Sequence, residues 1–316
     1  MDSYLGIDGG GTRTRGVLVA ASGEVLAEAE GGASNYHNAD AGAAADVVAR
    51  VAAEALERAG HPRLRCVFAG CAGIKARRDI EALGAALARR DAFAGADIEV
   101  ANDLHNALAG GLAGRPGIAL IAGTGSNSLG RDGAGATFMC GGWGWLLDDR
   151  GGGFGLAIEA VRHAARSADG REAPTALLGR AMEFFGVAEP NELLARFYVD
   201  PWTPDGVAAF APEVMRCAAE GDAVASRIVE AGAAALTELV GGVFRKLDFS
   251  GGPDVVLLGG CVSNAPVYAA LVADAVRNTV PGARIVPPVH GPAHGAAINA
   301  LRYGGIAPLP ERICKT

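Results

Sequence analysis

The same local order occurs twice in this chain of 316 residues: an apolar strand, a loop of glycine and threonine, and then two short strands. In the first copy, an apolar strand over residues 4–8 runs into the glycine-rich residues 9–12. In the second copy, residues 118–122 run into a glycine and threonine loop at residues 123–126. Strands that alternate with glycine turns and helical segments are typical of α/β proteins. The repetition predicts an α/β protein made of two similar halves with a cleft between them.

Each loop is followed by a hairpin signal. Residues 15–21 and 24–30 flank a serine–glycine turn, and residues 128–131 and 136–140 flank an aspartate–glycine turn. Two short segments separated by a glycine-containing turn favour antiparallel pairing. We therefore expect three consecutive strands at the start of each half.

The remaining segments predict helices and strands in the first half and a helical insertion in the second. In the first half we expect helices over residues 44–59, 77–90 and 103–112, and strands over 64–69 and 98–101. In the second we expect mostly helix over 153–247, strands over 254–258 and 284–286, and helices over 265–278 and 292–303. We place the two domains at residues 1–115 and 116–316. The sequence leaves open whether the last helix packs on the first domain.

Composition and charge narrow the class of protein. Half of the residues are apolar, which is typical of a folded globular chain. The net charge of −7 argues against nucleic acid as a partner, because phosphate backbones bind to basic surfaces. No apolar run is as long as the roughly 18 residues of a membrane helix, and no secretion signal is evident, so we expect no membrane partner and a cytoplasmic location. The six cysteines form no Cys-x-x-Cys pair and are expected to be reduced thiols.

The first loop has the residue types that bind phosphate. Gly10 and Gly11 allow backbone amides to approach phosphate oxygens, and Thr12 and Thr14 can add hydroxyl donors. Asp8 ends the preceding strand, where a carboxylate can hold hydrated Mg²⁺ through water. A glycine-rich hairpin that binds no ligand is the alternative. Neither the Walker lysine motif nor the dinucleotide-binding glycine motif is present.

Two later segments extend this pattern. Thr124 and Gly125 repeat the phosphate-loop chemistry after a second apolar strand, so the two loops together predict a triphosphate site. Gly259 and Gly260, with Ser263, follow another apolar strand and open a helix. Paired glycines there let a flat ring lie against the backbone, and we assign this segment to adenosine. Taken alone, a strand–glycine–helix turn is a weak signal.

In this order, the three motifs resemble the two phosphate motifs and the adenosine motif of the acetate and sugar kinase, heat-shock chaperone and actin superfamily. Residues 295–297, Gly-Ala-Ala, resemble its late connecting motif. Residues 141–144, Gly-Gly-Trp-Gly, and 148–151, Asp-Asp-Arg-Gly, resemble N-acetylglucosamine kinases of the BadF/BadG/BcrA/BcrD ATPase family. This resemblance implies two ribonuclease-H-like (actin-like ATPase) domains. It also implies transfer of phosphate from MgATP to the 6-hydroxyl of an amino sugar, most directly N-acetylglucosamine, by a homodimer.

The resemblance places the catalytic aspartate at Asp103, which would accept the proton of the sugar hydroxyl. From the sequence alone, Asp103 lies between a strand and a helix, where an ordinary N-cap aspartate is the alternative. The residues expected to bind the sugar combine amides, hydroxyls and carboxylates with glycines that let a ligand approach. They are Asn35, Asp103, Ser126, Asn127, Gly142, Trp143, Gly144 and Asp149. Arg150 departs from the family, where an acidic residue is common.

Other functions stay open at this point. A glucosamine kinase would have the same fold. An activator ATPase of a radical dehydratase would need cysteines for a shared iron–sulfur cluster, and Cys66 and Cys71 have no second matching pair. A sugar-responsive repressor would need an N-terminal helix-turn-helix. His290 and His294 have a spacing that can bind metal, but a polar turn is the preferred interpretation. His37 and Asn38 are either sugar-entrance or solvated loop residues.

Overall fold

A computed structural model describes residues 1–35, 40–310 and 313–314. The chain divides into two compact units. Unit 1 contains Met1–Arg115 and Pro287–Thr316, and unit 2 contains Pro116–Val286. The chain therefore leaves unit 1 once and returns to it near its C-terminus.

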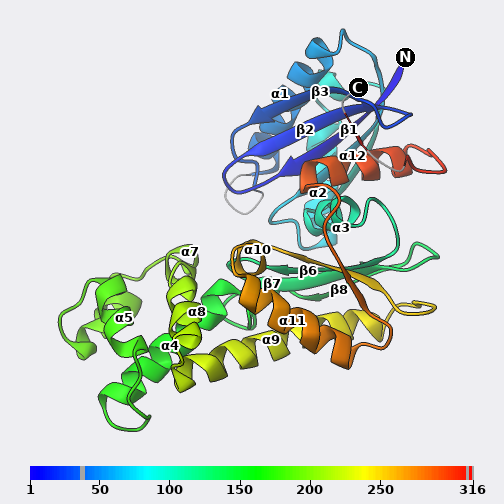
Figure 1. The fold of residues 1–316 in the computed structure, drawn as a ribbon. Helices are drawn as coiled ribbons and strands as arrows, with labels where there is room; N and C mark the ends of the chain where they lie inside the picture. The colour runs from blue at the N-terminus through cyan, green and yellow to red at the C-terminus, as the bar shows by residue number, and fades with distance from the viewer. Residues whose placement is uncertain (36–39, 311–312, 315–316) are drawn as a thin grey trace. The chain divides into compact units, whose positions relative to one another are not determined.

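The described part of unit 1 contains a five-stranded mixed sheet (Figure 1). Its strands are β1 (Asp2–Gly9), β2 (Thr14–Ala20), β3 (Val25–Gly31), β4 (Arg63–Cys71) and β5 (Asp97–Asn102). The order across the sheet is β3-β2-β1-β4-β5. β1, β2 and β3 pair antiparallel, whereas β4 and β5 run parallel to β1.

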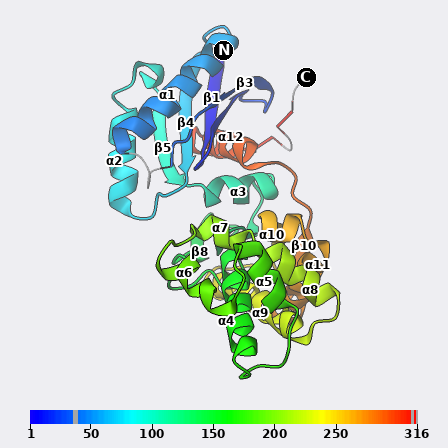
Figure 2. The same ribbon diagram turned by 90° about the vertical axis from the view of Figure 1, so that its left-hand side faces the viewer.

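Side chains of β1 alternate between two cores, as the period of two along a strand requires. Leu5 and Ile7 belong to the core beneath α1 (Ala41–Arg58) and α2 (Arg77–Leu87). Tyr4 belongs to the core on the other face, with residues of α3 (Leu104–Gly111) and α12 (Pro292–Tyr303). Figure 2 shows α1 and α12 on opposite sides of the strands. Burial of both faces explains the uncharged runs at residues 4–7 of β1 and 66–71 of β4.

α12 packs against β1 at unusually short range. A Cβ atom at Gly6 of β1 would lie 1.9 Å from the backbone nitrogen of Ala297 in α12. A Cβ atom at Gly295 of α12 would lie 1.9 Å from the carbonyl oxygen of Asn106 in α3. Only glycine fits at these two positions, so the Gly-Ala-Ala segment lets the C-terminal helix lie against both β1 and α3.

The described part of unit 2 repeats the sheet of unit 1. Its strands are β6 (Gly117–Ala122), β7 (Ser126–Arg131), β8 (Thr137–Gly141), β9 (Asp254–Leu258) and β10 (Arg284–Val286). The order β10-β9-β6-β7-β8 is that of unit 1, with β6, β7 and β8 antiparallel and β9 and β10 parallel to β6. The predicted duplication is confirmed, and each unit is a ribonuclease-H-like domain.

The helical insertion predicted between the strands of unit 2 is also present. It contains α4 (Gly153–Ala168), α5 (Leu177–Phe185), α6 (Leu193–Tyr198), α7 (Pro204–Ala208), α8 (Ala211–Ala219) and α9 (Ala223–Phe244). After β9 come α10 (Gly260–Ser263) and α11 (Pro266–Thr279). An aromatic cluster of Phe184, Phe185, Trp202 and Phe210 joins α5, the segment before α7, and the start of α8.

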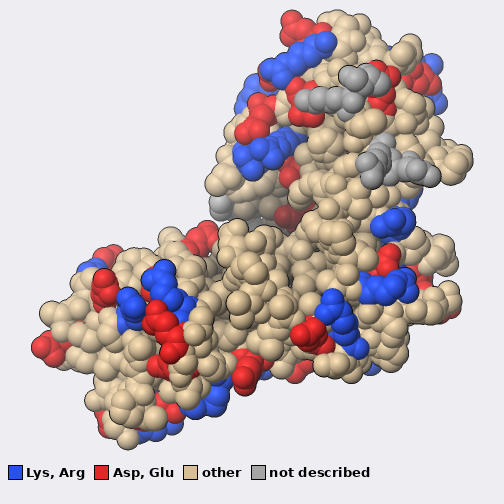
Figure 3. All heavy atoms as spheres, in the orientation of Figure 1, with Lys and Arg blue, Asp and Glu red and all other residues tan. Residues whose placement is uncertain are grey.

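The surface carries mixed charge. Ion pairs such as Arg15–Glu30 (3.0 Å) and Arg284–Asp254 (2.8 Å) join opposite signs. Figure 3 shows Lys and Arg beside Asp and Glu on the face that it draws. None of the described helices is long and apolar enough to cross a bilayer. All six cysteines are free thiols in the described structure.

Candidate functional site

The first glycine loop connects β1 to β2 in unit 1 and exposes its tip. The Gly10 amide donates to the Arg13 carbonyl oxygen (2.9 Å), which closes a tight turn. Gly11 and Thr12 are exposed at the tip. A Cβ atom at Gly11 would lie 3.6 Å from Asn35 Nδ2, so Asn35 lies beside the loop. The tip therefore leaves backbone and one hydroxyl accessible to an anion.

Thr14, which the sequence predicts as a phosphate ligand, is fully buried at the base of this loop. Its hydroxyl donates to the Gly32 carbonyl oxygen (2.8 Å) and lies 2.7 Å from Ser34 Oγ. Because the hydroxyl already has partners within the protein, Thr14 joins the ends of β2 and β3 in this structure.

Asp8 lies at the end of β1 and is held by a buried amide that the sequence analysis missed. Asn106 Nδ2 donates to Asp8 Oδ1 (2.9 Å) and also contacts the carbonyl oxygens of Ile7 (3.2 Å) and Gly70 (3.0 Å). Burial raises the pKa of Asp8, and the hydrogen bond from Asn106 opposes that rise. Asn106 thus links α3 to strands β1 and β4 and fixes the carboxylate.

Asp103 occupies the N-cap position of α3, but its side chain makes no capping hydrogen bond. The Leu104 amide, the first of the helix, instead donates to the side-chain Oδ1 of Asn102 (2.9 Å). Burial, followed by the negative charge of Asp8, raises the pKa of Asp103 to about 6, and nearby backbone amides offset only part of the rise. The N-cap alternative therefore fails. Unit 1 holds two partly buried carboxylates that repel each other.

The second glycine loop, between β6 and β7, is fixed to the start of α4. The Gly123 amide donates to the Gly125 carbonyl oxygen (2.9 Å). The Gly153 and Phe154 amides donate to the carbonyl oxygens of Gly123 (2.8 Å) and Thr124 (2.9 Å). Thr124 Oγ1 donates to Asp205 Oδ1 at 2.6 Å, a contact with the helical insertion that the sequence analysis did not foresee.

Two predicted sugar ligands lie directly beneath this loop. Asp149 is buried, and its Oδ1 accepts a hydrogen bond from the Ser126 amide (3.1 Å). A Cβ atom at Gly125 would lie 2.5 Å from Asp149 Oδ2. Ser126 Oγ donates to the Arg150 carbonyl oxygen (2.9 Å). In this structure Ser126 and Asp149 shape the loop, and the side chain of Arg150 is exposed.

Asn127 and the Gly-Trp-Gly segment lie together on unit 2. A Cβ atom at Gly142 would lie 3.4 Å from Asn127 Cβ, and Gly142 and Gly144 have φ angles of 73° and 89°. Between them Trp143 is 72% exposed. Asn127 Oδ1 is buried and has no hydrogen-bond partner among the described residues. Such an orphan acceptor suits a ligand that brings a hydroxyl or an amide N–H.

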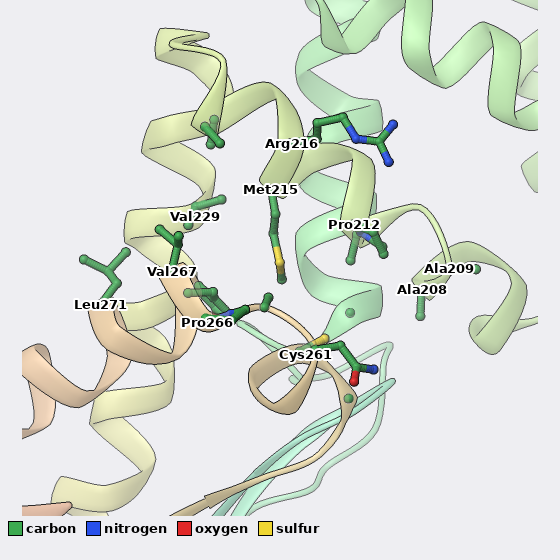
Figure 4. Close-up of a pocket in the computed structure, with 18 of the residues that line it drawn as sticks. Ala208, Ala209, Pro212, Met215, Arg216, Val229, Cys261, Pro266, Val267 and Leu271 are labelled. Atoms are coloured by element: carbon green, nitrogen blue, oxygen red, sulfur yellow. The ribbon is translucent and has the colours of Figure 1, made fainter.

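The predicted adenosine segment borders a cavity of about 830 Å³ within unit 2 (Figure 4). Gly260 and Cys261 line it beside Gly123 and Thr124 of the second loop. Its apolar wall comes mostly from the insertion and α11, through Pro212, Met215, Val229, Val267 and Leu271. A largely apolar cavity with a few polar groups at one end is typical of a site for a flat heterocycle with a polar tail.

The three adenosine residues predicted from the sequence differ in their positions. Gly260 lines the cavity, whereas Gly259 and Ser263 are not among its lining residues. Gly259 has φ of 95°, and a Cβ there would lie 2.4 Å from the Ala122 carbonyl oxygen, so it lets β9 pass close to β6. Asn264 and Asp205 line the cavity without having been predicted. Asn264 lies one helical turn beyond Gly260, so its position in the sequence could have indicated that it lines the same cavity. No feature of the sequence near Asp205 indicates that it does so.

His290 lies before α12 and His294 lies in the first turn of that helix, and both have contacts within the protein. The Ile313 amide donates to His290 Nε2 (3.4 Å), and His294 Nε2 lies 3.9 Å from Glu28 Oε1. No group of three or more His, Cys, Asp or Glu side chains among the described residues could hold a metal ion. His37 and Asn38 lie outside the described residues.

The sequence profile of the BadF/BadG/BcrA/BcrD ATPase family matches residues 5–300, nearly the whole chain. The protein belongs to this ATPase family. The resemblance inferred from the motifs is thereby confirmed, and membership of the BadF/BadG/BcrA/BcrD family implies ATP as the nucleotide.

Two proteins similar to this chain carry the names of sugar kinases. The N-acetylmuramic acid/N-acetylglucosamine kinase of Clostridium acetobutylicum is 29% identical, over 95% of this chain and 98% of its own. The N-acetyl-D-glucosamine kinase of Dictyostelium discoideum is 28% identical, over 94% of this chain and 97% of its own. A solved structure from Chromobacterium violaceum, provisionally described as an N-acetylglucosamine kinase, has a TM-score of 0.72 and 27% identity. It covers 95% of this chain and 98% of its own.

Proposed function

We propose that this protein is an ATP-dependent kinase that phosphorylates an amino sugar, most directly N-acetylglucosamine, at its 6-hydroxyl. Asp103 carries the proposal. Its carboxylate is not used to cap α3, and its pKa is raised to about 6 by burial and by Asp8. A base whose pKa lies near neutral pH is ionised in the cell and still accepts a proton readily.

In the proposed reaction, Asp103 accepts the proton of the sugar hydroxyl as that oxygen attacks the γ-phosphorus of ATP. The bond to the β-phosphate oxygen breaks and ADP leaves. Phosphoryl transfer depends mainly on positioning the two substrates and on neutralising the charge of the phosphates. One general base and the groups that bind the phosphates are therefore enough for catalysis. Gly10, Gly11 and Thr12 of unit 1, and Gly125 with Thr124 of unit 2, would bind the phosphates.

Magnesium fits the carboxylates of unit 1. Asp8 and Asp103 are partly buried, and the charge of Asp8 raises the pKa of Asp103, so a divalent cation near Asp8 would relieve the repulsion. Mg²⁺ keeps several waters and is commonly bound by one or two carboxylates together with substrate phosphates. Asp8 would hold it through water, and the bound ion would neutralise developing negative charge on the phosphates.

The choice of an acetamido sugar rests on the residues around Asn127. Its buried Oδ1 lacks a partner among the described residues. Gly142, which precedes the exposed Trp143, packs against the Asn127 side chain. An acetamide N–H or a ring hydroxyl would satisfy that oxygen. The named relatives from Clostridium acetobutylicum and Dictyostelium discoideum support the same class of substrate.

Glucosamine is the second candidate because its ammonium group would need a carboxylate, which Asp148 or Asp149 would supply. Asp149 contacts the amide of Ser126, the residue before Asn127.

An iron–sulfur activator function is less well supported. Cys66 and Cys71 are both buried, and burial raises the pKa of their thiols to about 11 and about 12. Cluster ligation requires thiolates that can reach an interface. The homodimer and the cytoplasmic location stay predictions.

The test is ADP release from ATP with N-acetylglucosamine, N-acetylmuramic acid, glucosamine or no sugar. We expect release to depend on the sugar, and phosphorus–proton NMR correlation of the product to place the phosphate on carbon six. ADP release that is the same with and without every sugar would make the protein an ATPase of another kind.

A further inference from the structure

Tyr268 of α11 joins the cavity of unit 2 to the turn that carries Asp149. Tyr268 is 1% exposed and lines the cavity of about 830 Å³. Its hydroxyl donates to the Gly151 carbonyl oxygen at 2.9 Å, although 117 positions separate the two residues. A carbonyl oxygen can only accept, so the direction of this bond is fixed. Burial also raises the pKa of Tyr268, so the hydroxyl keeps its hydrogen at neutral pH.

The turn that Tyr268 contacts, residues 149–152, has an uncommon backbone conformation. Asp149 has φ of 62° and Gly151 has φ of 80°, and the Gly152 amide closes the turn on the Asp149 carbonyl oxygen (3.2 Å). A residue with a Cβ keeps such a φ only where its surroundings hold it. A Cβ atom at Gly151 would lie 2.4 Å from the Gly232 carbonyl oxygen, so the turn lies directly against α9. The hydrogen bond from Tyr268 is one of the contacts that hold this Asp149 turn.

The Asp149 turn in turn shapes the proposed sugar site. Asp149 Oδ1 accepts a hydrogen bond from the Ser126 amide (3.1 Å), and the Arg150 carbonyl oxygen accepts one from the Ser126 hydroxyl (2.9 Å). Ser126 precedes Asn127, whose buried Oδ1 has no hydrogen-bond partner among the described residues. A displacement of the turn would therefore move the backbone that positions Asn127.

A ligand in the cavity would change how firmly Tyr268 is held. Without a ligand, the cavity gives the Tyr268 ring room to move, and this motion breaks its hydrogen bond to Gly151. A heterocycle packed against the ring takes up that room, so the bond stays formed and the Asp149 turn stays in place. Binding that restricts motion lowers the entropic cost of a second binding event, and the coupling acts equally in both directions.

We propose that Tyr268 is a positioning residue through which adenosine in the cavity strengthens sugar binding at the Asp149 turn. The inference rests on the proposed kinase function and assigns no chemical step to Tyr268. It makes the binding of ATP and of the sugar cooperative, because the turn that shapes the sugar site is held most firmly when the cavity is filled.

The experiment is calorimetric titration of the full chain with N-acetylglucosamine, once without and once with saturating adenosine. Adenosine has no phosphate, so it cannot act through phosphate contacts with the glycine loops. For the parent protein we expect adenosine to tighten sugar binding by about tenfold, a usual coupling between two sites. Tyr268→Phe keeps the ring but removes the hydroxyl, and should reduce this effect to less than about twofold while adenosine binds alone as before. In turnover, the variant should raise KM for the sugar more than it lowers kcat.

Tyr198→Phe is the matched control, because Tyr198 is 81% exposed and does not line the cavity, and this variant should keep the full coupling. Hydrogen–deuterium exchange of the parent adds a test that needs no variant. Adenosine alone should slow exchange in the peptide that contains residues 149–152, and unchanged exchange there would contradict the proposal.

Two further results would overturn the proposal: sugar affinity of the parent that does not respond to adenosine, or full coupling in Tyr268→Phe. A Tyr268→Phe variant with a lower Tm but full coupling would show that the bond is only structural. If the parent binds neither N-acetylglucosamine nor the ATP analogue AMPPNP, the kinase function itself fails and this inference falls with it.

Discussion

Asn106 Nδ2 donates a hydrogen bond to Asp8 Oδ1 at 2.9 Å, although 98 positions separate the two residues. The same nitrogen contacts the carbonyl oxygens of Ile7 and Gly70, and the Asn106 side chain is fully buried. We therefore expect Asn106 to contribute to the stability of unit 1. We also expect it to hold the Asp8 carboxylate, which we assign to magnesium, in position.

Replacing Asn106 with alanine should destabilise the protein by about 1–3 kcal/mol, because buried acceptors lose their donor. The hydrogen bond from Asn106 lowers the pKa of Asp8, so its loss should let that pKa rise further. The destabilisation should then be larger at neutral pH, where Asp8 is ionised, than in acid. Urea unfolding at both pH values measures this, and equal losses at the two would show that the bond does not act on the Asp8 charge.

Asp103→Asn should keep the fold and most nucleotide affinity but reduce turnover by about 10²–10⁴-fold, the usual contribution of a positioned base. The asparagine side chain has nearly the same shape, so packing should not change. Sugar-dependent ADP release by the variant within about tenfold of the parent would remove Asp103 from the mechanism.

Activity should fall in acid because the proposed base works only when ionised. The pKa of Asp103 is about 6 without metal, and Mg²⁺ near Asp8 would lower it. The value of kcat/KM should therefore decline in acid from a midpoint at or below about pH 6, by about tenfold per pH unit. A profile measured with saturating Mg²⁺ tests this. A kcat/KM that stays constant well below pH 6 would mean that the step reported by kcat/KM requires no such base.

The same carboxylate should reduce stability at neutral pH. Its pKa is raised from 3.8 to about 6 on folding, so its stabilising effect is complete below pH 3.8 and is lost as pH rises through about 6. Asp103→Asn should therefore have a higher Tm than the parent at neutral pH, with the difference shrinking in acid. A variant that is less stable than the parent at neutral pH would show that the carboxylate is held by favourable contacts.

Two glycines of the second loop, Gly123 and Gly125, differ in the space around them and can serve as a variant and its control. A Cβ at Gly125 would lie 2.5 Å from Asp149 Oδ2, whereas a Cβ at Gly123 meets nothing within 4 Å. Gly125→Ala should lower Tm because the Ser126–Asp149 hydrogen bond must shift. Gly123→Ala should keep Tm and weaken ATP binding if phosphates approach the Gly123 backbone. Unchanged ATP affinity in Gly123→Ala would place the phosphates elsewhere.

The sequence predicted the sheets because their signals are local. Strands β9 and β10 and helix α12 have the predicted bounds, and both hairpins form around their glycine turns. Where bounds differ, side-chain contacts account for some of the difference. The helix predicted over residues 77–90 ends at Leu87. Beyond its end, the Arg90 guanidinium donates hydrogen bonds to the carbonyl oxygens of Ala86 (3.1 Å) and Gly42 (3.2 Å).

The contacts within the site were less accessible from sequence because they depend on tertiary packing. Nothing local to Asn106 shows that its amide reaches Asp8, and nothing local to Asp205 shows that it reaches Thr124. Thr14 has the right residue type for a phosphate ligand, yet its hydroxyl is used at the base of its own loop. Residue type predicts what kind of ligand to expect. The packing of strands and insertion helices decides which atoms would be available to that ligand.

The most direct test of the kinase account is kcat/KM for N-acetylglucosamine, glucosamine and glucose measured side by side with saturating MgATP. A pocket that hydrogen-bonds an acetamide leaves polar groups such as Asn127 Oδ1 unpaired when glucose enters. We predict that N-acetylglucosamine exceeds glucose by about tenfold or more. If glucosamine leads, the acetamide assignment is wrong while the amino-sugar kinase stands. If glucose is the best of the three, the amino-sugar account is contradicted.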